Sequence, residues 1–109
     1  MSLYVLCHPW EVQEIEDGIV VKLTQRDLDV QTVSILADEL LELALESGMS
    51  RLHLDFAKVT ILTSLVLGKL TALDRRLRET GGRLVLCNLT PGLQRVFQAA
   101  NWPRDSTRH

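Results

Sequence analysis

Two hydroxyl side chains, Thr63 and Ser64, are adjacent at the point where a β-prone segment gives way to a helical pattern. A Thr or Ser at such a position accepts a hydrogen bond from an unpaired amide of the first helical turn, and this capping role needs no further function. A phosphate on Ser64 would also meet the positive end of the helix dipole and add about two negative charges. The pair therefore predicts either a simple helix cap or a regulatory modification site.

Leu65 follows these hydroxyls and does not belong to the buried side of the predicted helix. The residues that define the buried side recur at helical spacing: Val66, Leu70, Leu73 and Leu77. Leu65 points away from them, so we expect an exposed apolar side chain beside Ser64. Such a surface is suited to binding another protein and to being switched by a charge.

The patterns of common catalytic, nucleotide and metal sites are missing from the sequence. The glycines are scattered, with no GxGxxG or GxxxxGK[ST] motif, and Ser64 lacks a glycine elbow. Cys7 and Cys87 lie far apart in apolar runs, without CxxC or HxxxH spacing, which favours buried thiols over a disulfide or a metal site. We therefore predict no enzyme activity, no cofactor and no metal. A nucleotide-binding or enzyme domain is the weakest alternative.

Composition indicates one soluble domain that binds neither nucleic acid nor the membrane interior. The chain has 109 residues, 46% hydrophobic and 24% charged, with a net charge of −2. Arg75, Arg76 and Arg78 fall in the last turns of a predicted helix, where cations suit the dipole, and no aromatic residues interleave with them. No apolar stretch reaches the roughly 20 residues that span a bilayer. We expect a cytoplasmic protein.

Hydrophobic periodicity predicts alternating strands and helices. An Asp-Gly turn joins the first two main strands into a hairpin, and successive strand and helix units predict right-handed parallel crossovers. The predicted elements are strands at 12–15, 19–23, 51–56 and 83–87, helices at 29–47 and 63–80, a third helix from Thr90 and Pro91, and a short strand or arm at 3–7. The fold class is α/β, a mixed sheet covered by about three helices. We expect residues 1–102 to form the domain and residues 103–109 a polar tail. Trp10 and Trp102 should pack at the edge of the domain, and the alternative for Trp102 is a contact with a partner.

Three segments carry a family resemblance in their order and spacing. They are residues 52–64 (LHLDFAKVTILTS), residues 81–91 (GGRLVLCNLTP) and Val96-Phe97. Together they resemble the STAS domain of bacterial anti-sigma factor antagonists. Residues 23–29 are similar to the loop before the family's first helix, with Asp29 at its acidic position.

This resemblance implies a partner-switching role in transcription. The unphosphorylated antagonist binds an anti-sigma factor that is also a serine kinase, and so frees the sigma factor; phosphorylation breaks the complex and a phosphatase restores it. By position, the phosphoacceptor is Ser64, with Thr63 as second choice. The implied binding surface centres on Thr63, Ser64 and Leu65, with Asp29 at its edge.

The chain departs from the family pattern at the start of the second helix. Family members have Asp-Ser-Ser-Gly or Asp-Ser-Ala-Gly, whereas this chain has Thr63-Ser64-Leu65-Val66. The acidic neighbour and the glycine are therefore replaced. A second interpretation is the cytoplasmic STAS subunit of a bacterial lipid ABC transporter, which binds an ATPase and supports transport.

Overall fold

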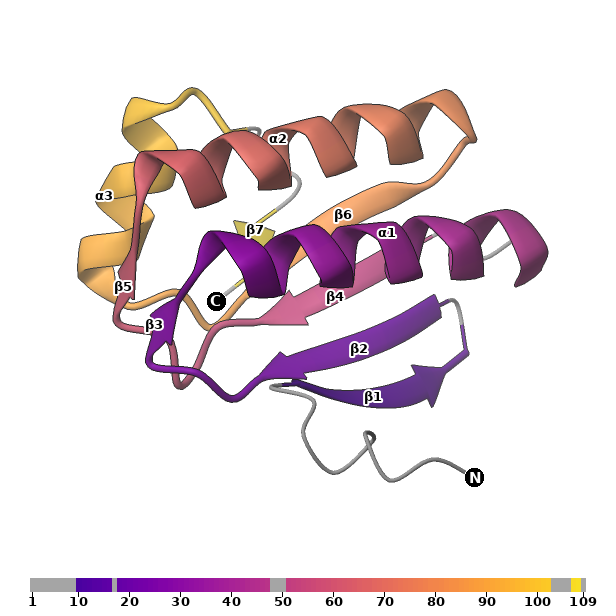
Figure 1. Ribbon diagram of the computed structural model, residues 1–109, viewed down its shortest axis with the longest axis horizontal. Coiled ribbons are helices and arrows are strands. Elements are labelled where there is room, and N and C mark those ends of the chain that lie inside the picture. Colours follow the sequence, from indigo (N-terminus) through magenta and orange to yellow (C-terminus); the bar gives the residue numbers. More distant parts are fainter. Residues whose placement is uncertain (1–9, 17, 48–50, 103–106, 109) are drawn as a thin grey trace.

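A five-stranded mixed sheet organises the molecule (Figure 1). The computed structural model describes residues 10–16, 18–47, 51–102 and 107–108. In sheet order, the strands are β1 (Trp10–Ile15), β2 (Gly18–Leu23), β4 (Arg51–Asp55), β6 (Arg83–Cys87) and β7 (Thr107–Arg108). β1 and β2 are antiparallel, and the remaining neighbours are parallel. The predicted hairpin and parallel crossovers are confirmed.

Alternation along the parallel strands creates one apolar face. Ile19, Leu52 and Leu84 lie side by side in the register, and the next inward layer is Val21, Leu54 and Leu86. All six are at most 2% exposed. Helices α1 (Val30–Ser47) and α2 (Ser64–Glu79) pack their apolar sides into this core.

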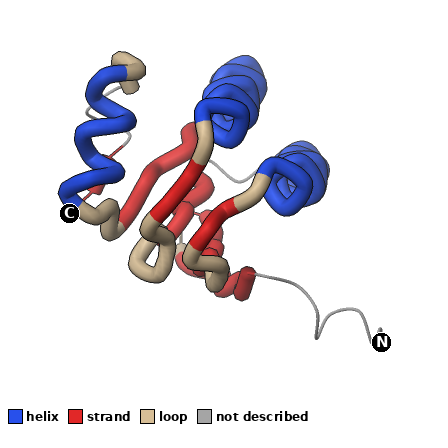
Figure 2. Tube along the Cα trace, turned by 60° about the vertical axis from the view of Figure 1, so that its left-hand side comes forward, coloured by secondary structure: helices blue, strands red, loops and turns tan. Residues whose placement is uncertain are grey.

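The three helices lie in the order α1, α2, α3 across the molecule, with α3 spanning Pro91–Ala99 (Figure 2). Thr90 caps α3 by accepting a hydrogen bond from the Leu93 amide, and Pro91 occupies the first turn, as the sequence predicts. In the described part of the chain, no helix has both the length and the apolar character needed to cross a membrane.

Three strands of two residues each were not predicted. β3 (Asp27–Leu28) and β5 (Ile61–Leu62) form a separate parallel pair, and β7 extends the main sheet beside β6. Such short strands show no side-chain periodicity, because their pairing is made by backbone groups. β7 lies within residues that the sequence suggested were only a polar tail.

Trp102 and Cys87 were also assigned environments from the sequence. Trp102 is 9% exposed, and its ring packs edge-on against Phe97 at 5.3 Å, so the expected packing of this residue is confirmed and makes it part of the core. Cys87 is half-buried instead of buried, because it is the last residue of β6. Cys7 and the predicted strand at 3–7 lie outside the described residues.

The end of α2 is closed by a glycine turn. Gly81 has φ +86°, a conformation that L side chains rarely adopt. Its amide donates to the Arg78 carbonyl at 3.1 Å, and the Gly82 amide donates to the Leu77 carbonyl at 2.8 Å. This is a Schellman motif, which satisfies the last carbonyls of the helix.

Replacing Gly81 and replacing Gly68 by alanine should change the free energy of unfolding in opposite directions. Gly81→Ala forces a side chain into the left-handed region and should lower the free energy of unfolding by about 1 kcal/mol. Gly68 lies inside α2, where an added Cβ meets nothing within 4 Å, so Gly68→Ala should raise it by about 1 kcal/mol. Urea unfolding measures both, and shifts of the same sign would contradict this assignment.

Candidate functional site

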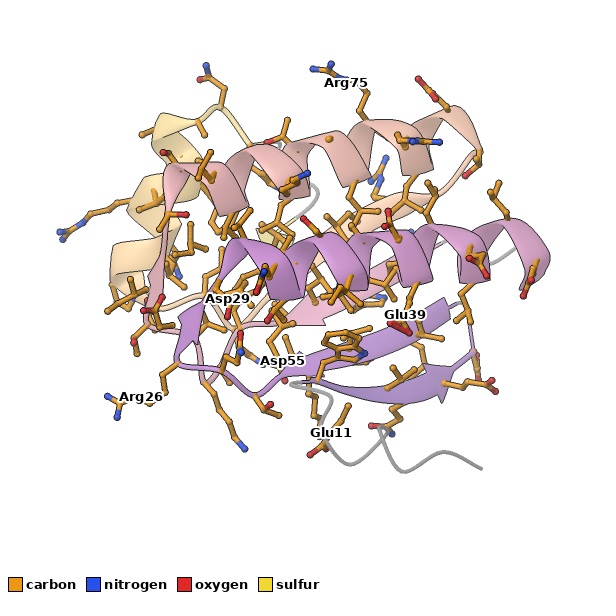
Figure 3. The ribbon with its side chains drawn as sticks, viewed as in Figure 1. Glu11, Arg26, Asp29, Glu39, Asp55 and Arg75 are labelled. Carbon is orange, nitrogen blue, oxygen red and sulfur yellow. The ribbon has the colours of Figure 1, made fainter. Side chains whose placement is uncertain are left out.

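Asp29 caps the first helix. Its Oδ1 accepts a hydrogen bond from the Thr32 amide at 2.7 Å, and its Oδ2 accepts one from Gln25 Nε2 at 3.4 Å. The bond from the Thr32 amide is the main reason that the pKa of Asp29 lies below its ordinary value. Asp29 is exposed, so this carboxylate is both a structural cap and a negative charge at the surface (Figure 3).

Thr63 caps the second helix, as predicted. Its backbone is extended (φ −94°, ψ 168°), and its Oγ1 accepts a hydrogen bond from the Val66 amide at 3.3 Å. Ser64 is then the first helical residue and is exposed. Leu65 is 68% exposed, which confirms that it points away from the core.

The short β3–β5 pair brings these two helix starts together. Leu28 pairs with Leu62 in a parallel register. Asp29 and Thr63, the residues that follow them, therefore lie on two adjacent segments of the backbone. The Arg26 carbonyl accepts bonds from the Thr60 amide at 2.8 Å and the Ile61 amide at 3.1 Å, which holds the register. The four residues singled out in the sequence, namely Asp29, Thr63, Ser64 and Leu65, therefore lie at one end of the molecule.

Sequence reasoning missed Ile61, which is 57% exposed although it stands in an apolar run. Such a run is usually buried, but successive side chains of a strand point to opposite faces, so Ile61 is exposed whereas Leu62 is partly buried. We call the surface formed by Asp29, Ile61, Thr63, Ser64 and Leu65 the N-cap face. It combines apolar side chains with hydroxyls and one carboxylate, a mixture typical of a protein-binding surface.

A shallow groove of about 350 Å³ starts at Ser64 and runs between α2 and the end of α3. Its other lining residues are mostly small or apolar: Leu67, Gly68, Thr71, Ala72, Arg75 and Ala100. Arg75 projects from the outer side of α2 (Figure 3). Among the described residues that line it, none carries a carboxylate or an imidazole, so no general base adjoins Ser64 in the groove.

The comparison with family models decides the family. The model described as "Mlab, STAS domain" matches residues 10–104. The chain belongs to the STAS domain family. This confirms the resemblance and the α/β fold derived from the sequence.

Solved structures share this STAS fold at low sequence identity. The anti-sigma factor antagonist SpoIIAA in its unphosphorylated form has a TM-score of 0.77 at 18% identity, over 91% of this chain and 85% of that one. A putative anti-sigma factor antagonist from Thermotoga maritima, TM1081, has a TM-score of 0.73 at 19% identity, over 94% and 88%. The murine anion transporter Slc26a9 has a TM-score of 0.59 at 16% identity, over 80% of this chain and 14% of the transporter.

The stabilisation by the Asp29 cap should depend on pH, whereas the stabilisation by the Thr63 cap should not. Because the pKa of Asp29 is lowered by folding, its ionised form stabilises the native state, and this contribution is lost as the pH falls through the folded pKa. The destabilisation caused by Asp29→Ala should therefore shrink between neutral pH and about pH 3. Thr63→Ala, the matched control, should cost about 1 kcal/mol at both pH values. Denaturant unfolding tests this, and a pH-independent effect at Asp29 would contradict it.

Proposed function

We propose that this STAS domain is a non-enzymatic binding module that docks on a protein partner through the N-cap face, as an anti-sigma factor antagonist. The observation that carries the proposal is the side-by-side start of α1 and α2, with the exposed Leu65 and Ile61 beside Ser64. An apolar side chain that is mostly exposed gains stability when a partner covers it. In this role the partner is an anti-sigma factor that is also a serine kinase, and binding takes place in the cytoplasm.

Phosphorylation of Ser64 would control this docking. The hydroxyl is exposed at the first position of α2, where the helix dipole favours an anion. The same phosphate would lie beside Leu65, so a partner that covers Leu65 would have to desolvate a dianion. SpoIIAA, whose fold this chain shares, has structures in unphosphorylated and phosphorylated forms, which supports the assignment. A phosphatase would restore the binding form.

The phosphorylation proposal predicts a single site. Incubation with ATP and each candidate serine kinase of the source organism should add one phosphate, detected by intact mass and mapped to Ser64, with Thr63 as second choice. Ser64→Ala should lose the modification, and phosphorylated protein should bind the kinase at least about tenfold more weakly. If the kinase binds tightly and modifies neither hydroxyl, the domain is a constitutive binder.

The docking surface can be tested with two matched leucines. Leu65 is 68% exposed at the start of α2, and Leu45 is 61% exposed near the end of α1. Leu65→Ala should weaken binding to the partner about tenfold, as expected for an apolar anchor of an interface. Leu45→Ala should leave binding unchanged. Equal effects measured by calorimetry would place the interface elsewhere.

A second candidate is the cytoplasmic STAS subunit of a bacterial lipid ABC transporter. Two observations favour it: Thr63 and Val66 replace the acidic residue and glycine of the switch motif, and a STAS fold forms a small part of the transporter Slc26a9. In that role the N-cap face would bind a transport ATPase without modification. Binding to an ATPase that is unchanged by Ser64→Ala and leaves no phosphate would favour this candidate.

A further inference from the structure

Acidic and basic side chains lie on different helices of this domain. Helix α1 has four acidic residues and no basic one: Asp38, Glu39, Glu42 and Glu46. Helices α2 and α3 together have five basic residues and two acidic ones. Figure 2 shows α1 and α3 at the two ends of the helix layer, with α2 between them, so one end of this layer is acidic and the other basic. The net charge of the chain is only −2, so two copies repel each other weakly.

The outer side of α1 forms an acidic ridge, which we define by Ile35, Asp38 and Glu42. These residues follow one another at intervals of three and four, on the side of the helix opposite to the buried Leu36 and Leu40. All three side chains are exposed, and the exposed fraction of Ile35 is 55%. Neither carboxylate forms an ion pair within the part of the chain that the structure describes. The ridge therefore offers one apolar side chain and two negative charges to a second molecule.

The groove between α2 and the end of α3 has the complementary character. A Cβ added at Gly68 would meet no atom within 4 Å, so the middle of the groove is open. Ala72 and Arg75 lie further along the same side of α2, and Arg75 is exposed and forms no ion pair with another described residue. From Ser64 to Arg75 the helix rises about 16 Å, whereas the acidic ridge is about 10 Å long, so the ridge fits within the groove.

We propose that the domain associates with a second copy of itself, with the acidic ridge of one copy seated in the groove of the next. Helices pack when the side-chain ridge of one fills the groove of another, and the small residues in this groove let a second helix approach closely. Ile35 is then covered by the apolar lining of the groove. Asp38 or Glu42 pairs with Arg75 of the neighbouring copy, a charge-assisted contact. The occupant is a second copy because the chain itself carries the apolar side chain and the carboxylates that complement the groove.

Such an association is head-to-tail, because the ridge and the groove are different surfaces of the same molecule. Each contact leaves one ridge and one groove unoccupied, so the assembly continues beyond two copies unless a ring closes. No kinase and no modification of Ser64 takes part, so self-association is independent of the proposed function. The groove begins at Ser64, so a copy seated in it would lie next to the N-cap face.

The test is analytical ultracentrifugation of the full chain from micromolar to millimolar concentration, at low and at high ionic strength. At low ionic strength, the weight-average mass should rise with concentration above that of one chain. High ionic strength should weaken the association at least about tenfold, because salt screens exposed charges. The mass of one chain under every condition would overturn the proposal and leave the groove to a different protein. An association that salt does not weaken would also overturn it.

Two complementary variants locate the contact. Asp38→Lys with Glu42→Lys reverses the charge of the ridge, and Gly68→Leu with Arg75→Ala fills the groove and removes its charge. Each variant alone should associate at least about tenfold more weakly than the unaltered protein. Mixed together, the two variants retain one intact ridge and one intact groove, so they should form a dimer that grows no further. If both variants have native circular dichroism and their mixture stays monomeric, the proposal is wrong.

A matched control separates this contact from a general effect of charge. Glu11→Lys with Glu14→Lys makes the same change in charge on β1, where both side chains are exposed, and should leave the association unchanged. Equal losses in the control and in the ridge variant would overturn the proposal. Should the ridge variant fail to fold, Asp38→Asn with Glu42→Gln removes the charges with little change of shape and should show a smaller loss in the same direction.

Discussion

The parallel pairing of β3 with β5 is the constraint on which the proposed binding surface depends. Each strand has only two residues, yet their register sets where two long helices begin. The Arg26 carbonyl, which accepts two backbone amides from the facing chain, holds this register. Without that pairing, Asp29 and Thr63 would still cap their own helices. However, the starts of α1 and α2 would no longer lie side by side, and Leu65 would not share a surface with Asp29.

The main sheet and the β3–β5 pair therefore have different roles in the fold. The sheet buries the aliphatic layers of β2, β4 and β6 beneath α1 and α2, and this burial stabilises the domain. The short pair lies at the start of both helices, where amides are oriented outward and side chains are exposed.

Helix capping also bears on the proposed phosphorylation of Ser64. The family pattern has an aspartate where this chain has Thr63, and the hydroxyl performs the capping role through the Val66 amide. A neutral cap leaves the helix dipole at the start of α2 uncompensated by any acid in its first turn. The electrostatic environment of Ser64 therefore accommodates an added anion. Asp29, the cap of α1, has a lowered pKa and is an ionised cap, so the two neighbouring caps differ in charge.

The sequence by itself determined the α/β class, the hairpin, the main helices and strands, both hydroxyl caps and the exposure of Leu65, because periodicity and capping are local properties. Tertiary structure alone decided the pairing of β3 with β5, the addition of β7 and the burial of Trp102. It also decided which distant side chains meet. Ile61 looks buried in its apolar run but is exposed, and Leu52 and Leu84, which are 32 residues apart in the chain, lie side by side in the core. Backbone hydrogen bonds between remote segments leave no mark on side-chain periodicity, so these surfaces emerge only from the fold.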